Sequence, residues 1–251
     1  MDPLAREQLI RLQDRHWWLR GRRAVYLDLL RRQLADHRPR QILDLGSGAG
    51  GFIDDLSHVG ETVIALDRDP VALTSGRRRG PSRALAGHCE ALPFSDGIFD
   101  LVCLFDVLEH TDDEERLLAE VKRVMHPGGL LALSVPAYPS LFSQNDRLSH
   151  HRRRYRRRRL RRKVRESGLH VERCTHTNVL LAPLLFPFVL ALKSIECLQP
   201  PAARPRRTNL SWDPPAWAHR WLEALFQAEL PLSRRWDLPA GMSILLFARA
   251  N

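Results

Sequence analysis

The chain has 251 residues and a formal net charge of +10. A chain of this length buries roughly three quarters of its unfolded surface, so its stability requires neither a disulfide nor a metal ion. Its four cysteines are widely spaced and form no CxxC pair, which argues against a zinc or redox site and favours a reducing compartment. The first ten residues have a polar helix pattern without the apolar core of a secretory signal. We therefore expect a cytoplasmic protein without a bound metal.

The order of apolar segments predicts an α/β fold. Residues 3–36 have roughly helical spacing and predict one or two amphipathic helices, with a break near Gly21. From Gln41 onward, short apolar runs alternate with helical stretches, which predicts a parallel sheet with helices on both faces. The predicted strands are 41–45, 62–66, 84–86, 99–105 and 130–135, and the predicted helices are 51–59, 70–78 and 111–125.

The second half of the chain contains its most apolar segment, residues 178–198. The longest uncharged run, 177–192, has about 16 residues, fewer than the roughly 20 that span a bilayer. We favour a core or lid helix over a helix in a membrane interface, because Pro183 and Pro187 disrupt a regular amphipathic helix. The other predicted elements are a basic helix at 156–167, a strand at 169–177, a surface linker at 199–215, a helix at 216–229 and a final strand at 242–248.

A glycine-rich turn, Gly46-Ser47-Gly48-Ala49-Gly50-Gly51, follows the first predicted strand. Glycines permit a sharp turn and the close approach of a ligand to the backbone, and this spacing satisfies the GxGxxG dinucleotide pattern. Asp67 ends the next predicted strand, where an acid accepts hydrogen bonds from ribose hydroxyls. Spacing alone leaves both NAD and S-adenosylmethionine open as ligands.

Asp44, two residues before the first glycine, separates these two ligands. A carboxylate there repels the pyrophosphate of a dinucleotide, whereas it attracts the ammonium and sulfonium groups of S-adenosylmethionine. The segment 87–94 is placed to wrap an adenine ring, and the segment 105–110 ends the fourth strand at the sheet edge that lines the ligand crevice. These features favour S-adenosylmethionine.

From about residue 41 to 136 the chain resembles the class I S-adenosylmethionine-dependent methyltransferases, in the group related to ubiquinone and menaquinone biosynthesis. The resemblance rests on ILDLGSGAGG, ALDRDP, CEALPFSDGIFDLV, FDVLEH and VKRVMHPGGLLALSVP, in this order. It implies a Rossmann-like seven-stranded sheet, mostly parallel with an antiparallel last strand, and S-adenosylmethionine as cofactor. The implied segments are an N-terminal helical cap (1–38), the cofactor-binding core (39–178), a helical insertion or acceptor lid (179–238) and the last strand of the sheet (239–251).

The resemblance also implies the roles of individual residues. Asp44 and the glycine loop would hold the methionine end, Asp67 the ribose hydroxyls, and Arg68 would lie beside the adenine. Family members commonly carry an acid where this chain has His88. The full set of cofactor-binding residues implied is Asp44, Gly46, Ser47, Gly48, Gly50, Asp67, Arg68, Glu90, Ala91, Leu92, Phe105 and Asp106.

The flanking segments HWWLRGRR (16–23), VPAY (135–138) and HRRRY (151–155) resemble methyltransferases of bacterial glycan and lipid-linked saccharide pathways. We expect a small-molecule, glycan or lipid-linked acceptor that is methylated on oxygen. A hydroxyl acceptor needs a base, and histidine is the usual choice near neutral pH; we predict His110 first and His151 second as catalytic residues. The acceptor-side candidates are His16, Trp17, Trp18, Tyr138, His150, His151 and Tyr155.

Residues 147–165 contain eleven arginines and one lysine. Such a run suggests contact with phosphates or with the cytoplasmic face of an anionic membrane, although a solvated arginine-rich helix explains it as well. One alternative is an RNA methyltransferase that grips phosphates with this run, but no RNA-binding module is recognisable, so nucleic acid is not the expected partner. A non-enzymatic adaptor that has lost its cofactor is disfavoured because Asp44, Gly46, Gly48 and Asp67 are intact. A nicotinamide oxidoreductase is disfavoured by Asp44 and by the expected antiparallel last strand. The sequence does not indicate an oligomeric state.

Overall fold

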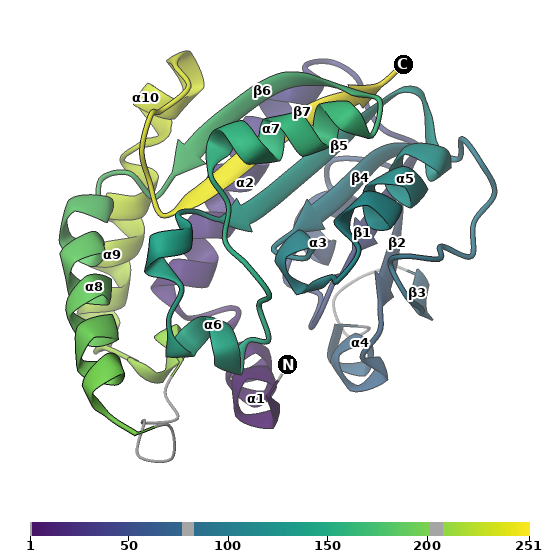
Figure 1. Cartoon of the computed structure of the whole chain (residues 1–251). Coiled ribbons are helices and arrows are strands. Elements are labelled where there is room, and N and C mark those ends of the chain that lie inside the picture. Colours follow the sequence, from purple (N-terminus) through teal and green to yellow (C-terminus); the bar gives the residue numbers. More distant parts are fainter. Residues whose placement is uncertain (1, 77–82, 201–207) are drawn as a thin grey trace.

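The structure, a computed structural model, describes residues 2–76, 83–200 and 208–251 (Figure 1). Seven strands form one sheet in the order β3-β2-β1-β4-β5-β7-β6. β7 is antiparallel to both of its neighbours, and the other pairs are parallel, which confirms the predicted fold class. The strands are β1 (Gln41–Leu45), β2 (Thr62–Asp67), β3 (Arg83–Ala86), β4 (Phe99–Phe105), β5 (Met125–Pro136), β6 (Leu169–Thr177) and β7 (Ser243–Ala250).

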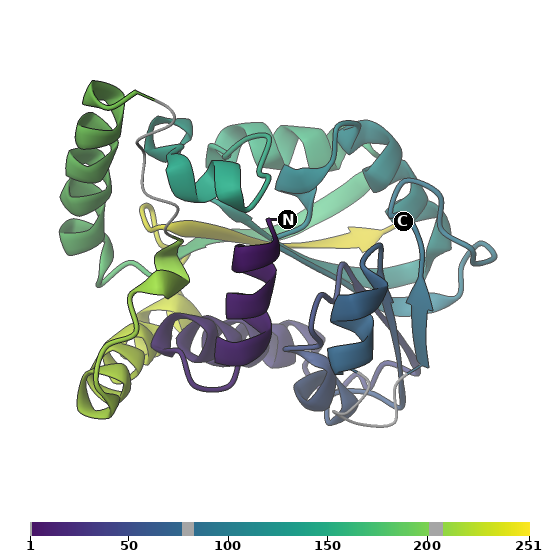
Figure 2. The same ribbon diagram turned by 90° about the horizontal axis from the view of Figure 1, so that it is seen from below.

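Helices cover both faces of the sheet, as Figure 2 shows from below. Buried side chains of α5 and α7 pack on one face, and those of α2 and α3 pack on the other. Short 3-10 turns are η2 (Leu108–His110), η3 (Pro139–Leu141) and η5 (Asn209–Ser211). The helices are α1 (Pro3–Leu12), α2 (Trp17–Leu34), α3 (Ile53–Ser57), α4 (Pro70–Gly76), α5 (Glu114–Val124), α6 (Gln144–Leu148), α7 (Arg157–Glu166), α8 (Ala182–Leu198), α9 (Ala216–Gln227) and α10 (Leu230–Arg235).

The predicted helix break near Gly21 is wrong. The chain breaks earlier, between α1 and α2, where the His16 ring caps α2 by accepting a hydrogen bond from the Trp18 N–H. Gly21 lies inside α2 because α9 packs closely there: a Cβ at this position would lie 2.9 Å from Cβ of Phe226. The glycine is explained by this close helix contact and not by a turn.

The segment predicted as an N-terminal cap has two structural roles. α2 is a layer of the core, because Val25, Leu29 and Leu30 are fully buried against the sheet. α1 lies away from that layer and reaches the glycine loop, where the side-chain amide of Gln13 donates to the carbonyl of Ala49. The division of the chain into a cap, a cofactor-binding core, an acceptor lid and a last strand stays a prediction.

For the apolar segment after β6 we favoured a core or lid helix; the core alternative is wrong, and the lid stays a prediction. The segment forms the 17-residue helix α8, in which Pro183 occupies the first turn, where a missing N–H is tolerated, and Pro187 lies inside. Much of its apolar surface is exposed. Among the described residues, no helix is long and apolar enough to cross a membrane. α10 was not predicted, and the predicted end of α4 at Arg78 and part of the 199–215 linker lie outside the described residues.

Substitution of Gly21 tests the close packing of α2 on α9. We expect Gly21→Val to lower the free energy of unfolding by about 2 kcal/mol, because the new side chain must displace Phe226. The control Arg31→Val places the same β-branched residue at an exposed position of α2 and should cost about 0.5 kcal/mol. Urea unfolding of both variants measures the difference, and equal losses would contradict the packing argument.

Candidate active site

A cavity of about 490 Å³ lies at the carboxyl ends of the central strands, a volume typical of small-molecule sites. Its walls come from α1, the loops after β1, β2 and β4, the segment 143–154, α8 and the start of β7. One hollow therefore connects the glycine loop with the region predicted to hold the acceptor. Its position agrees with the rule that open α/β sheets bind ligands at this edge.

The glycine loop has a backbone conformation that residues with a Cβ atom adopt only with strain. Gly46, Gly48 and Gly50 have φ values of +74°, +54° and +74°, a region that only glycine adopts without strain. A Cβ on Gly46 would also clash with the side chain of Val107. The loop is tied to β2, because the Gly48 N–H donates to Oδ2 of Asp67 at 2.8 Å. The turn therefore exposes its backbone to the cavity in a fixed shape.

The carboxyl group of Asp44 lies at the cavity beside this loop, without a cationic partner among the described residues. Its side chain is 3% exposed, and Oδ2 has no hydrogen-bond partner among the described residues. Burial, and then the nearby Asp67, raise the pKa of Asp44 to about 7. A cationic group at this place would stabilise the carboxylate. The orphaned oxygen fits the ammonium and sulfonium end of S-adenosylmethionine.

The predicted adenine and ribose contacts are brought together only in part. Asp67 and Arg68 line the cavity, as do His88, Cys89 and Glu90. Glu90 accepts a hydrogen bond from the Thr111 hydroxyl. Ala91 and Leu92 lie instead on a separate shallow groove against α5, because the chain turns back at His88, whose carbonyl accepts from the Ala91 N–H. An adenosine in the cavity could therefore contact the cavity-lining residues between Asp67 and Glu90, but not Ala91 or Leu92.

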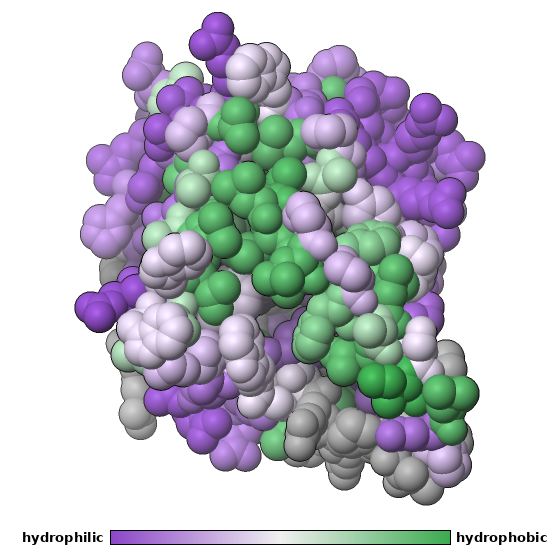
Figure 3. Space-filling view, turned by 90° about the vertical axis from the view of Figure 1, so that its left-hand side faces the viewer, coloured by the Kyte–Doolittle hydropathy of each residue, from purple (hydrophilic) through white to green (hydrophobic). Residues whose placement is uncertain are grey.

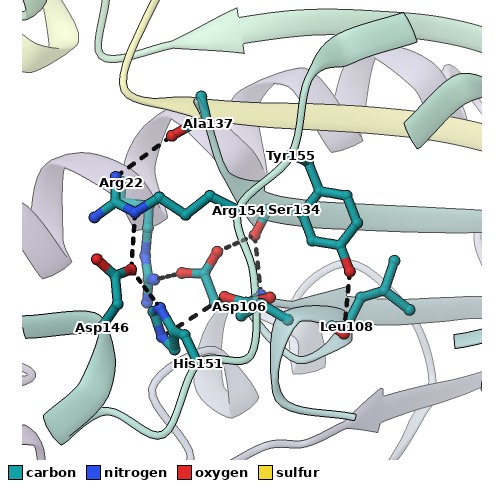
Figure 4. Close-up of polar contacts among 10 residues, drawn as sticks. Arg22, Asp106, Leu108, Ser134, Ala137, Asp146, His151, Arg154 and Tyr155 are labelled. Atoms are coloured by element: carbon teal, nitrogen blue, oxygen red, sulfur yellow. Dashed lines mark hydrogen bonds and ion pairs between the residues drawn. The ribbon is translucent and has the colours of Figure 1, made fainter. Parts of the chain in front are cut away.

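The end of β4 brings Phe105 and Asp106 to the cavity wall. Asp106 has φ +55°, and its carboxylate is held by the Ser134 hydroxyl at 2.9 Å and by the Arg22 guanidinium (Figure 4). Burial lowers the pKa of Arg22, while nearby Tyr26 and Glu109 oppose this. Arg22 therefore brings a positively charged side chain from α2 to the wall of the cavity. This role was not assigned to it from the sequence.

His151 is held by a buried acid on the other side of the cavity. Its Nδ1 lies 2.9 Å from Oδ1 of Asp146, which also accepts from Nε of Arg154 at 2.8 Å (Figure 4). Burial by itself would raise the pKa of Asp146, but the His151 and Arg154 contacts lower it to about 2. A proton on Nδ1 of His151 would be donated to the ionised Asp146, and Nε2 on the other side of the ring lies 3.9 Å from Oε1 of Glu109.

His110 and Glu109 lie next to His151. The two histidine rings meet edge to face with centroids 4.7 Å apart. Burial, and then His151, lower the pKa of His110 to about 3. Burial raises the pKa of Glu109 to about 8, and neither of its carboxyl oxygens has a hydrogen-bond partner in the described chain. The ligand atoms of these three residues lie within 4.8 Å of one another, so the cluster also has the composition of a metal site.

Only two of the seven acceptor-side candidates, Trp18 and His151, line the cavity. His16 caps α2, and Tyr155 is fully buried, with its hydroxyl donating to Glu114 at 2.6 Å. Tyr138 stacks on His176. Several residues that do line the cavity were not named from the sequence: Gln13, Arg22, Glu109, Val189 and Met242. Arg22 and Glu109 lie in segments that carry the resemblance but were given no role, and the other three follow no motif that names a ligand.

The arginine run is largely engaged within the protein. Arg153, Arg159 and Lys163 all pair with the buried Glu114. Arg162 pairs with Glu166 within α7. Further ion pairs join the run to other segments: Arg152–Asp112, Arg154–Asp146 and Arg157–Asp237. These contacts fasten α7 and the loop before it to the core, so the run is not simply a free phosphate-binding surface.

A family described as a methyltransferase domain matches residues 43–133. A protein of Mycolicibacterium smegmatis named as a probable S-adenosylmethionine-dependent methyltransferase is 33% identical over 136 residues, which are 53% of this chain and 51% of that protein. A demethylmenaquinone methyltransferase of Renibacterium salmoninarum is 34% identical over 102 residues, which are 40% of this chain and 43% of that protein. The chain thus spans about half the length of the curated relatives that it matches.

The fold is shared with solved structures. An S-adenosylmethionine-dependent methyltransferase of Mesorhizobium loti superposes with a TM-score of 0.57 at 18% identity, over 88% of this chain and 96% of that one. The family match begins within β1 and ends within β5, so it includes the glycine loop and the positions Asp44, Asp67 and Asp106. Residues 43–133 therefore match the methyltransferase domain of S-adenosylmethionine-dependent enzymes, and the sheet that they help to form has the fold of a solved enzyme of this kind.

Proposed function

We propose that this protein transfers a methyl group from S-adenosylmethionine to a hydroxyl of an amphiphilic small-molecule or lipid-linked acceptor, and that His151 takes up the hydroxyl proton. The observation that carries the proposal is the single cavity, which joins the glycine loop and Asp44 to His151. When bound, the cofactor supplies a methyl group on a sulfonium sulfur, which leaves readily. The protein then has to position the acceptor, exclude water and receive one proton.

His151 is better placed as the base than His110, the first choice from sequence. Asp146 orients its ring and stabilises the imidazolium that forms when Nε2 takes a proton, as an acid does for the histidine of other base systems. His110 has a pKa lowered to about 3 by burial and by His151, so its ring is a poor proton acceptor at neutral pH. Glu109, whose pKa of about 8 keeps it largely protonated at neutral pH, is placed to hydrogen-bond an acceptor oxygen.

The walls around His151 support an amphiphilic acceptor. Apolar side chains of Trp18, Val189, Leu210 and Met242 line the same cavity as the polar cluster. A ligand with a polar head and an apolar body matches this division. A quinol, suggested by the name of the Renibacterium relative, combines a hydroxyl with an apolar ring and belongs among the acceptors to assay, beside lipid-linked sugars.

Substitution of His151 tests its role as base. We expect His151→Gln to lower kcat by about 10² to 10⁴-fold with the dissociation constant for S-adenosylmethionine unchanged, because the amide cannot accept the proton. Single-turnover methyl transfer from labelled cofactor to the best acceptor, with calorimetric titration of the cofactor, measures both quantities.

His110→Gln is the matched control. Since the His110 ring is unprotonated and is not the assigned base, we expect a change of less than about tenfold in kcat. A larger loss from His110→Gln than from His151→Gln would reverse the assignment. Activity that a chelator abolishes and a divalent cation restores would show that the Glu109–His110–His151 cluster acts through a metal ion.

The pKa of Asp44 predicts how cofactor affinity depends on pH. The ionised form attracts the cationic ligand, and its pKa in the free protein is about 7. We therefore expect the dissociation constant to rise as pH falls below 7, by up to roughly tenfold per pH unit. Asp44→Asn should bind more weakly at pH 7.5, with little change between pH 5 and 7.5. Titration calorimetry measures both, and a flat profile in the wild-type protein would contradict the role of Asp44.

The same pKa predicts that Asp44 destabilises the free protein. Its folded pKa lies above the ordinary value of 3.8, so the folded state holds the proton more tightly and stability is lost as pH rises from about 4 to 7. We expect Asp44→Asn to raise the free energy of unfolding by about 4 kcal/mol at pH 8, with the gain vanishing near pH 4. Urea unfolding at the two pH values checks this, and an equal gain at both would contradict it.

A further inference from the structure

One side of the molecule exposes a large apolar surface, which we call the α8–α9 face. In α8, the positions Leu184, Phe188, Leu192 and Ile195 recur at helical spacing and are 67%, 58%, 43% and 52% exposed. Figure 3 shows green atoms over the centre and the lower right of this side, with pale atoms among them and purple atoms along the left and upper right edges. The further large exposed side chains of this face are Leu180, Leu190, Leu198, Trp217, Trp221 and Leu232. Patches of this kind mark interaction sites.

The composition of α9 favours a bilayer surface over a protein partner. Trp217 and Trp221 are 67% and 69% exposed on one stripe of the helix, with the exposed Arg220 between them. Tryptophan with arginine is the combination that lies at the boundary between lipid chains and headgroups. The indole rings have both an apolar body and an N–H that stays in the polar layer.

The charge around the face also matches an anionic surface. Of the acidic side chains described in α8 and α9, none is exposed: Glu196 accepts from the Gln144 N–H, and Glu223 pairs with Arg20. Basic groups are exposed nearby, Arg220 in α9 and Arg235 at the end of α10. The whole chain carries a net charge of +10. An anionic headgroup layer would therefore meet positive charge at the rim of the apolar face.

The length and composition of the described helices limit how deeply the protein can enter a bilayer. No described helix can cross a membrane, so α8 would lie along the interface, with its outer stripe among the acyl chains and its inner side on the protein. That inner side borders the active site: Val189 lines the cavity, and Phe186 packs edge to face against Tyr138. A bilayer against the outer stripe would therefore lie one helix away from the cavity.

We propose that the α8–α9 face docks this protein on an anionic lipid bilayer, in the plane of the headgroups. The docking itself does not depend on the proposed methyl transfer. If both hold, an amphiphilic acceptor would reach the cavity from the membrane past α8, without crossing bulk water.

Flotation with lipid vesicles tests the docking, in the absence of cofactor and acceptor. The full chain is mixed with vesicles of pure phosphatidylcholine or of equal parts phosphatidylcholine and phosphatidylglycerol. We expect it to float with the mixed vesicles and less with the neutral ones. The double variants Phe188→Gln/Ile195→Gln and Trp217→Gln/Trp221→Gln should each lower the partition coefficient at least tenfold, because their apolar surface no longer enters the bilayer.

The control is Val71→Gln/Ile98→Gln, which removes exposed apolar side chains of α4 and of the segment before β4, and it should float as the wild type does. Failure of the wild-type chain to float, or equal flotation of all variants, would overturn the proposal. A dimer in sedimentation experiments that either face variant dissociates would assign the face to a second copy instead. Cofactor titration of the same samples separates this result from the methyl-transfer proposal, because the face variants should bind S-adenosylmethionine normally.

Discussion

The site depends on how three carboxylates at the carboxyl edge of the sheet are neutralised. Asp67 accepts backbone N–H groups of Gly48 and Asp69, and Asp106 is held by Arg22 and the Ser134 hydroxyl. Asp44, between them, has a buried oxygen without a partner in the described chain. The fold thus satisfies two acids internally and leaves the third to a ligand. This one imbalance selects a cationic ligand and explains why a domain that could bind anions at its glycine loop is suited to a sulfonium compound instead.

On the opposite side of the cavity, the surroundings of two buried acids, Asp146 and Glu109, shift their pKa values in opposite directions. Asp146 is as buried as Asp44, yet contacts with His151 and Arg154 lower its pKa to about 2, while the pKa of Glu109 is raised to about 8 by burial. Environments that push acid pKa values apart are typical of sites that handle protons. The ionised Asp146 on one side of His151, and the largely neutral Glu109 and His110 beside it, are the arrangement that the proposed role of His151 as a base requires.

Sequence reasoning predicted the half of this site that follows directly from strands. β1 and β4 have the predicted bounds, and the residues after β1, β2 and β4 reach the cavity because parallel strands end at one edge. The other half could not be predicted, since Arg22, Asp146 and Val189 come from three distant segments that only tertiary packing brings together. Local rules also failed where packing overrides them: Gly21 lies inside a helix because Phe226 needs its space, and Ala91 and Leu92 are turned away from the cavity by one tight turn.

α8 shows why an apolar sequence does not by itself predict burial. The two faces of the sheet are already covered by α5 and α7 on one side and by α2 and α3 on the other, so the core has little remaining area for another helix. α8 contributes Leu185 to the edge of that core and leaves its opposite stripe exposed. A helix that is apolar around most of its circumference needs a second apolar environment. Because the described core offers only one, the exposed stripe of α8 is the observation on which the proposed docking to a bilayer rests.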